Sequence, residues 1–167
     1  MYYYYKQDKS HSNELNVDEG LGFITKHPAI TFDRTEEMGI GPLMYIYLEV
    51  FTIIKRGFSR VYNEWHLTNN GRSCSKAVLI SKVPIYQFMP DNGIHICFCR
   101  TNPEDRGNGY YPTLLKTIIK NNPDKDFYMI VESSNISSIK GIEKAGFVRY
   151  AEGEKVGKTF KITRYVE

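Results

Sequence analysis

The chain has 167 residues, of which 41% are hydrophobic, so it is long enough for one substantial core and has about the usual size of a single domain. A formal net charge of +3 is too small to indicate a nucleic-acid binder. The three cysteines lack CxxC spacing, which indicates neither a disulfide framework nor a metal site. No stretch resembles a secretory signal or a membrane span, so we expect a cytoplasmic protein.

The first sixty residues give the weakest signals. The tyrosine run at residues 2–5 suits a half-buried strand, and GFITKHPAITF (22–32) suits a short strand. Residues 42–57, PLMYIYLEVFTIIKRG, begin with proline and end with basic residues and glycine. This pattern predicts a helix, although the β-branched and aromatic residues also allow a strand.

Strand patterns dominate from residue 60 onward. RVYNEWHL (60–67) and RSCSKAVLISKV (72–83) flank Asn70-Gly71, a strong signal for a two-residue hairpin turn. After a proline-marked link at 84–90, GIHICFCRT (93–101) predicts the next strand.

A glycine loop and two helices follow that strand. NPEDRGNGYYPTLLKTIIK (102–120) is a loop leading into an amphipathic helix, and KDFYMIVES (125–133) is a strand. NISSIKGIEKAG (135–146) is a second helix, and residues 147–166 form a strand pair. Because a strand–helix–strand crossover is normally right-handed and parallel, we expect one parallel pair in an otherwise antiparallel sheet.

The glycine loop has two interpretations. Its glycines allow backbone N–H groups from Gly107 to Tyr111 to converge on one point, and the helix that follows adds the positive end of its dipole. Such a nest binds phosphate oxygens. The alternative is a plain turn with a glycine cap, which is the better interpretation of this short motif taken alone.

The context of the loop resembles the GNAT superfamily of acyl-CoA-dependent N-acyltransferases. Its signature is Arg or Gln, two residues, Gly, one residue, then Gly or Ala, and here Arg106 and Gly109 match it. Tyr111 departs at the sixth position, where the family has a small residue, so its ring should turn either into the sheet or over the cofactor. The resemblance is clearest over residues 94–147 and extends over 61–167.

A second family motif lies in the helix after the next strand. Asn135, Ser138 and EKAGF (143–147) match it in order and spacing. The resemblance implies an α/β (α+β) fold: a mixed, mostly antiparallel sheet with one parallel pair splayed at a bulge, and helices on both faces. From the length of the chain we expect a single domain over residues 1–167, with residues 1–60 showing no resemblance to the family.

The implied activity is acetyl transfer. The chain would move an acetyl group from acetyl-CoA to a primary amine by direct transfer, with no metal. An amino sugar is the expected acceptor, with another small amine or a protein amine as alternatives. Ile142 stands where the family often has a tyrosine acid. This loss motivates a second possibility, a non-catalytic acyl-CoA-binding module with the same fold.

The resemblance also implies cofactor-binding residues. Cys99 and Thr101 would offer backbone partners to the pantetheine arm. Arg106 would either lend charge or brace the loop. Asn135 and Ser138 would approach the cofactor from the second helix, although a helix cap is the alternative role of Asn135. The pyrophosphate would lie against the loop residues Arg106, Gly107, Asn108, Gly109, Tyr110 and Tyr111.

Candidate catalytic groups lie on two strands. Glu132, at the end of strand 125–133, and His95 are the expected general bases, with a solvated strand end and a packed strand residue as the respective alternatives. Cys97 and Cys99 are two residues apart in a strand, so we expect them on one face, as small buried side chains. His66 faces either the acceptor pocket or a packed aromatic strand.

Overall fold

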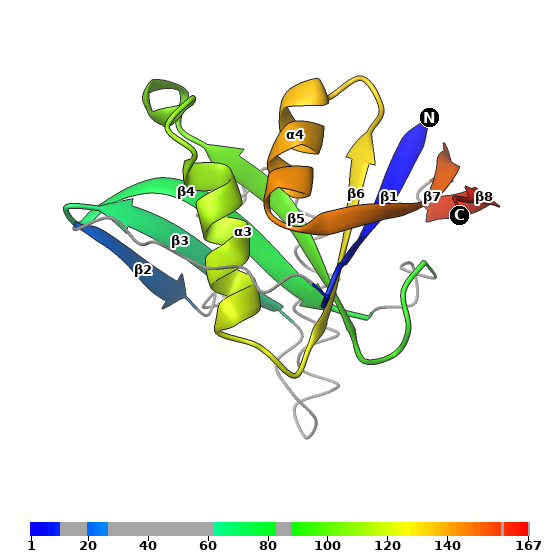
Figure 1. Ribbon diagram of the computed structural model, residues 1–167, viewed down its shortest axis with the longest axis horizontal. Coiled ribbons are helices and arrows are strands. Elements are labelled where there is room, and N and C mark those ends of the chain that lie inside the picture. Colours follow the sequence, from blue (N-terminus) through cyan, green and yellow to red (C-terminus); the bar gives the residue numbers. More distant parts are fainter. Residues whose placement is uncertain (11–19, 27–61, 83–87, 158, 167) are drawn as a thin grey trace.

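A computed structural model describes residues 1–10, 20–26, 62–82, 88–157 and 159–166 (Figure 1). These residues form an eight-stranded sheet in the order β2-β3-β4-β5-β6-β1-β7-β8. The strands are β1 Tyr2–Gln7, β2 Leu21–Lys26, β3 Tyr62–Asn69, β4 Arg72–Ser81, β5 Gly93–Thr101, β6 Asp126–Glu132, β7 Phe147–Val156 and β8 Thr159–Tyr165, and the helices are α3 Tyr110–Lys120 and α4 Ile136–Lys144.

The β3–β4 hairpin confirms the turn prediction. Asn70 and Gly71 have φ values of 49° and 79°, the left-handed pair that a two-residue turn between twisted strands requires. β2 adds to the free edge of β3, with Leu21 opposite Asn69. The helix predicted at 42–57 lies outside the described residues, as do residues 27–32 of the strand predicted at 22–32.

The parallel pair and its bulge also match the prediction. β5 and β6 pair only from Gly93 opposite Asp126 to His95 opposite Tyr128. Beyond His95, β5 continues along β4 as far as Thr101. Phe98 has a φ of 50°, and the register with β4 shifts there, so two residues of β5 oppose one of β4. β5 and β6 therefore separate toward their carboxyl ends.

The bulge corrects one expectation. Cys97 packs in the cluster that contains Val78, whereas Cys99 packs in the cluster beneath α3 and α4. The two cysteines therefore lie on opposite faces of the sheet. Strict alternation would place them on one face, but the extra residue at Phe98 reverses the alternation.

Both described helices cover the same face of the sheet. Figure 1 shows α3 and α4 in front of the strands, and their buried side chains join one core cluster. This cluster includes Leu114, Leu115, Ile118 and Ile142. The opposite face carries a second cluster around Tyr4, whose other buried members are Val78, Ile80, Phe88, Met89 and Ala151. Neither described helix is long and apolar enough to cross a membrane.

The tyrosine run forms an interior strand. β1 lies between β6 and β7, antiparallel to both. The strand was predicted, but Tyr4 and Tyr5 are fully buried rather than half-buried. Long-range pairing causes the difference, because an interior strand is covered on both sides by neighbours that lie more than 120 residues away in the sequence.

Candidate cofactor-binding and transfer site

The glycine loop adopts a conformation that requires its glycines. Gly107 and Gly109 have φ values of 85° and 74°. A β-carbon at either residue would meet no heavy atom within 4 Å, so the backbone conformation, rather than crowding, demands glycine. Gly109 is the N-cap of α3 and provides no side-chain cap. The N-cap residue therefore satisfies none of the backbone N–H groups at the start of this helix with a side chain.

Several backbone N–H groups of the loop lack protein acceptors. Asp105 and Arg106 donate to Asn102 and Pro103, at 3.0 and 3.4 Å. In the described part of the chain, the N–H groups of residues 107–111 make no such bond. Free N–H groups and the positive dipole end of a helix together favour an anion.

An arginine from the β3–β4 hairpin braces this loop. Arg72 Nη1 and Nη2 donate to the two carboxylate oxygens of Asp105, at 2.9 and 2.6 Å. These hydrogen bonds, with the charge of Arg72, hold the pKa of Asp105 below its usual range. Asn102 Nδ2 donates to the Ser73 carbonyl oxygen at 2.7 Å. The loop is therefore anchored to the start of β4.

No sequence motif indicated the pairing of Arg72 with Asp105. They are 33 residues apart, and the sequence offers no signal for a pairing over that distance. Arg106, by contrast, is exposed, and its side chain makes no ion pair or hydrogen bond with the described residues. Among the described residues, the arginine that braces the loop is Arg72.

The ring of Tyr111 turns into the sheet. It packs against Gly141 of α4, and its hydroxyl lies beside the thiol of Cys99 on β5, close enough for each group to affect the pKa of the other. Burial raises the pKa of Tyr111 well above its ordinary value, and burial raises the pKa of Cys99 to about 12. Because this large side chain is accommodated between α4 and β5, it leaves the surface of the glycine loop clear.

The second motif supplies a helix cap. Asn135 Oδ1 accepts from the backbone N–H of Ser138 at 3.2 Å and from Ser137 Oγ at 3.1 Å. This confirms the capping role of Asn135. Ile142, at the position of the family's usual tyrosine acid, is only 1% exposed and cannot donate a proton.

The two predicted bases have different surroundings. Glu132 is exposed at the end of β6, where β5 and β6 have separated, and is paired with Tyr2 of β1. His95 lies at the last paired position of β5, buried against the edge of the Phe88 ring with centroids 5.1 Å apart. Burial lowers the pKa of His95 to about 3.

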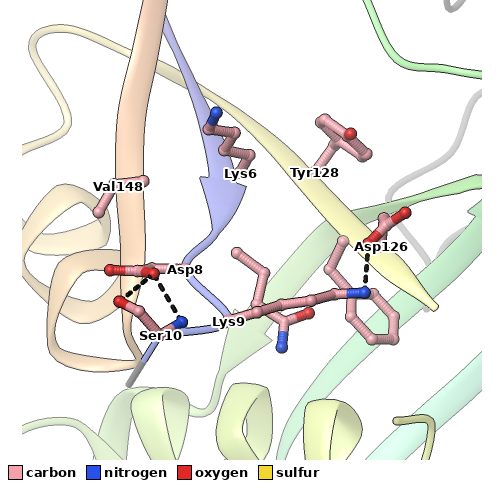
Figure 2. Close-up of a pocket in the computed structure, with 9 residues that line it drawn as sticks. Lys6, Asp8, Lys9, Ser10, Asp126, Tyr128 and Val148 are labelled. Carbon is pink, nitrogen blue, oxygen red and sulfur yellow. Dashed lines mark hydrogen bonds and ion pairs between the residues drawn. The ribbon is translucent and has the colours of Figure 1, made fainter. Parts of the chain in front are cut away.

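A surface cavity of about 410 Å³ lies at the other end of the sheet (Figure 2). It is near the start of β6, where β5 and β6 are still paired, and so is far from the glycine loop. Its charges are largely engaged: Lys9 Nζ lies 2.6 Å from Asp126 Oδ1, and Asp8 accepts two bonds from Ser10. Among the described residues no cluster of three His, Cys, Asp or Glu side chains is placed to hold a metal.

Solved structures with a similar fold are acetyltransferases. A GCN5-related N-acetyltransferase from Sphaerobacter thermophilus matches 89% of this chain and 48% of its own, with a TM-score of 0.60 and 12% identity. A GNAT-family acetyltransferase from Colwellia psychrerythraea matches 89% of this chain and 52% of its own, with a TM-score of 0.54 and 14% identity.

A third neighbour is similar in length. An acetyltransferase of the GNAT family from Streptococcus agalactiae matches 86% of this chain and 93% of its own, with a TM-score of 0.54 and 12% identity. The chain thus spans about half the length of the first two structures and nearly all of the third. No protein-family model matches the sequence, and comparison with curated proteins found no match.

Proposed function

Since the chain has the fold of the GNAT acetyltransferases, we propose that it moves an acetyl group from acetyl-CoA to a primary amine by direct transfer. One observation carries the proposal. The start of α3 has no side-chain cap, and the glycines at 107 and 109 have left-handed conformations. This loop comes after β5, the strand that separates from its parallel partner β6. An anion-binding loop at the mouth of an opened strand pair suits a ligand with a pyrophosphate and a long, thin arm.

Each part of the loop and its neighbours has a proposed task toward acetyl-CoA. The N–H groups of residues 107–111 hold the pyrophosphate, with Arg106 adding charge. The backbone of β5 at Cys99 and Thr101 pairs with the pantetheine arm in the manner of an added strand. Asn135 and Ser138, at the start of α4, contact the arm from the other side of the opening.

Acetyl transfer requires little of the protein beyond holding the amine and the thioester in position. The cofactor supplies an activated acyl group, and holding an amine against it contributes up to roughly 7–11 kcal/mol in ideal geometry. Of the two predicted bases, His95 is the weaker candidate, because an imidazole with a pKa of about 3 binds a proton too weakly. A thiol with a pKa of about 8.5 leaves without much protonic help, so the loss of the tyrosine acid at Ile142 is tolerable.

The decisive test is a pair of glycine variants. Gly109→Glu places bulk and negative charge in the loop and should abolish CoA binding measured by calorimetry. Gly157→Glu is the matched control, because Gly157 also has a positive φ, 60°, and open space, but lies between β7 and β8. CoA binding of ordinary strength by Gly109→Glu would contradict the proposed site.

The buried Ile142 favours a second candidate, an acyl-CoA-binding module without catalysis. A thiol-release assay with acetyl-CoA against amino sugars, amino acids and polyamines separates the two functions. Release that depends on an amine supports the transferase. CoA binding without release across the whole panel supports the binding module.

A further inference from the structure

Three buried polar side chains lie in a row on β3. Glu64, His66 and Thr68 are 4%, 8% and 5% exposed and alternate with Trp65 and Leu67, which pack beneath α3 and α4. The polar row therefore lies on the opposite face of the sheet. Burying a carboxylate is costly unless it is paired, so a core that needed only packing would favour an apolar residue at position 64.

The carboxylate of Glu64 is held by two basic groups. His66 Nε2 lies 3.2 Å from Glu64 Oε1, and Lys76 Nζ on β4 lies 3.8 Å from the same oxygen. His66 Nδ1 lies 2.9 Å from Ser73 Oγ. His66 Nδ1 and the Ser73 hydroxyl form a hydrogen bond, whereas Nε2 lies close to the Glu64 carboxylate without the geometry of a hydrogen bond to the described residues. The serine therefore holds the imidazole beside the carboxylate.

Strand register places Glu64 level with the separation of β5 and β6. Glu64 pairs with Val78, and Val78 pairs with Cys97, the residue before the bulge at Phe98. Two strand spacings, roughly 10 Å, separate the backbones of Glu64 and β5, a distance that a glutamate side chain and one water can span. The same hairpin is tied to the glycine loop through Ser73 and Asn102.

The proposal assigns the two faces of the sheet to the two substrates. α3 and α4 pack on one face, and the acceptor amine would approach the opened strands from the other face, on which Val78 and Cys97 lie. Glu64 and His66 both lie on that other face. On β2, the register partner of His66 is Ile24, and that of Glu64 is Lys26.

We propose that Glu64 is the general base for the acceptor amine and that His66, held by Ser73, is its positioning residue. The inference rests on the proposed function and adds a base that neither the motifs nor the comparisons assign. An ammonium N–H bond breaks as a proton passes to the Glu64 carboxylate, directly or across one water. The freed nitrogen pair then forms the bond to the thioester carbon, the C–S bond breaks, and the second proton that the nitrogen loses passes to the departing sulfur, so that the products are the amide and the free thiol. Glu64 afterwards returns its proton to solvent.

The test compares two carboxylates in the full chain. Glu64→Gln keeps the shape of the side chain but cannot accept the proton, so kcat for amine-dependent thiol release should fall by about a hundredfold or more. The KM for acetyl-CoA and the affinity for CoA should not change, because the glycine loop is intact. Glu132→Gln should lower kcat much less. A wild-type kcat in Glu64→Gln, or a larger loss in Glu132→Gln, would overturn the inference.

Chemical rescue separates a catalytic from a structural role. Added formate should restore part of the thiol release of Glu64→Ala, and none of that of His66→Ala, whose loss should be smaller. CoA affinity reports whether each variant is folded. If the wild type releases no thiol with any amine, the proposed function fails and this base fails with it. If the wild type is active and formate leaves Glu64→Ala unchanged, only the assignment of Glu64 fails.

Discussion

The ring of Tyr111 on α3 packs so closely against Gly141 on α4 that a β-carbon on residue 141 would lie 2.8 Å from Cε1 and closer still to Cδ1. Position 141 in α4 therefore requires glycine as long as the ring of Tyr111 occupies this space. The hydroxyl of Tyr111 lies beside the thiol of Cys99 on β5.

This contact predicts that Gly141→Ala has opposite effects on the free energy of unfolding in the wild type and in the Tyr111→Ala variant. In the wild type, Gly141→Ala should lower the free energy of unfolding by roughly 1–3 kcal/mol, because a rigid ring occupies the space. In Tyr111→Ala, the same substitution should raise it by up to about 1 kcal/mol, through helix propensity alone. Urea unfolding measures both, with the exposed Lys140→Ala as control. An equal effect in the two backgrounds would show that the residues do not couple.

The brace between Arg72 and Asp105 predicts a pH dependence of the glycine loop. Because the folded pKa of Asp105 is depressed, its contribution is present above the ordinary aspartate pKa of about 3.9 and is lost as pH falls through the lower folded value. Hydrogen exchange of the bonded amides of Asn102, Asp105 and Arg106 should therefore stay slow to pH values below the usual aspartate range. Arg72→Met should bring the loosening up toward that range and weaken CoA binding.

Arg106→Met is the control for the brace. Since the Arg106 side chain makes no ion pair or hydrogen bond within the described residues, loop exchange should be unchanged in this variant. Its effect should be confined to CoA affinity. Loosening of the loop in Arg106→Met, with none in Arg72→Met, would show that the wrong arginine has been assigned the bracing role.

The cap of α4 predicts a separable stability effect. Asn135→Ala should cost about 1 kcal/mol of unfolding free energy, because the N–H of Ser138 loses its acceptor. Asn135→Ser retains a capping oxygen and should be nearly as stable as the wild type. CoA affinity measured on the serine variant then isolates the cofactor role. Reduced affinity supports it, and unchanged affinity leaves Asn135 as a cap alone.

The two cysteines of β5 are expected to be unreactive in the folded protein. Burial raises the pKa of Cys97 well above its ordinary value and that of Cys99 to about 12, so both are protonated at pH 8. A thiol reagent such as DTNB should label them much more slowly in the native protein than in the unfolded chain. Rapid labelling of native protein, lost in Cys99→Ala, would instead indicate an activated thiol.

Protonation of His95 should oppose folding in acid. Its pKa falls from 6.5 to about 3 in the folded state, so below pH 6.5 the unfolded chain binds a proton that the native protein does not. Stability should decline by about 1.4 kcal/mol per pH unit between pH 6.5 and 3 from this group. Urea titrations at several pH values test this, and His95→Gln should lack that part of the slope.

Local patterns predicted most of the elements that the structure describes. Asn70-Gly71 specified its hairpin because few residues adopt two successive left-handed conformations. The order of strands and helices after residue 93 predicted the parallel pair through the handedness of crossovers. Gly107, Gly109 and Asn135 could be recognised because their roles depend on their own backbone or on residues a few positions away.

Long-range features escaped prediction because they are set by packing between distant segments. The interior position of β1 and the bond from Arg72 to Asp105 join residues far apart in the chain. The bulge at Phe98 moved Cys97 and Cys99 to opposite faces, since one added residue inverts the alternation of a strand.

The loop motif separates what the sequence determines from what only tertiary packing decides. By itself the sequence determined that residues 107 and 109 can take the left-handed conformations of an anion-binding loop, because glycine alone does so without strain. It left the ring of Tyr111 between two positions, into the sheet or over the cofactor. Only the tertiary structure decided between them, because the space beside Gly141 and the thiol of Cys99 come together when α3, α4 and β5 pack.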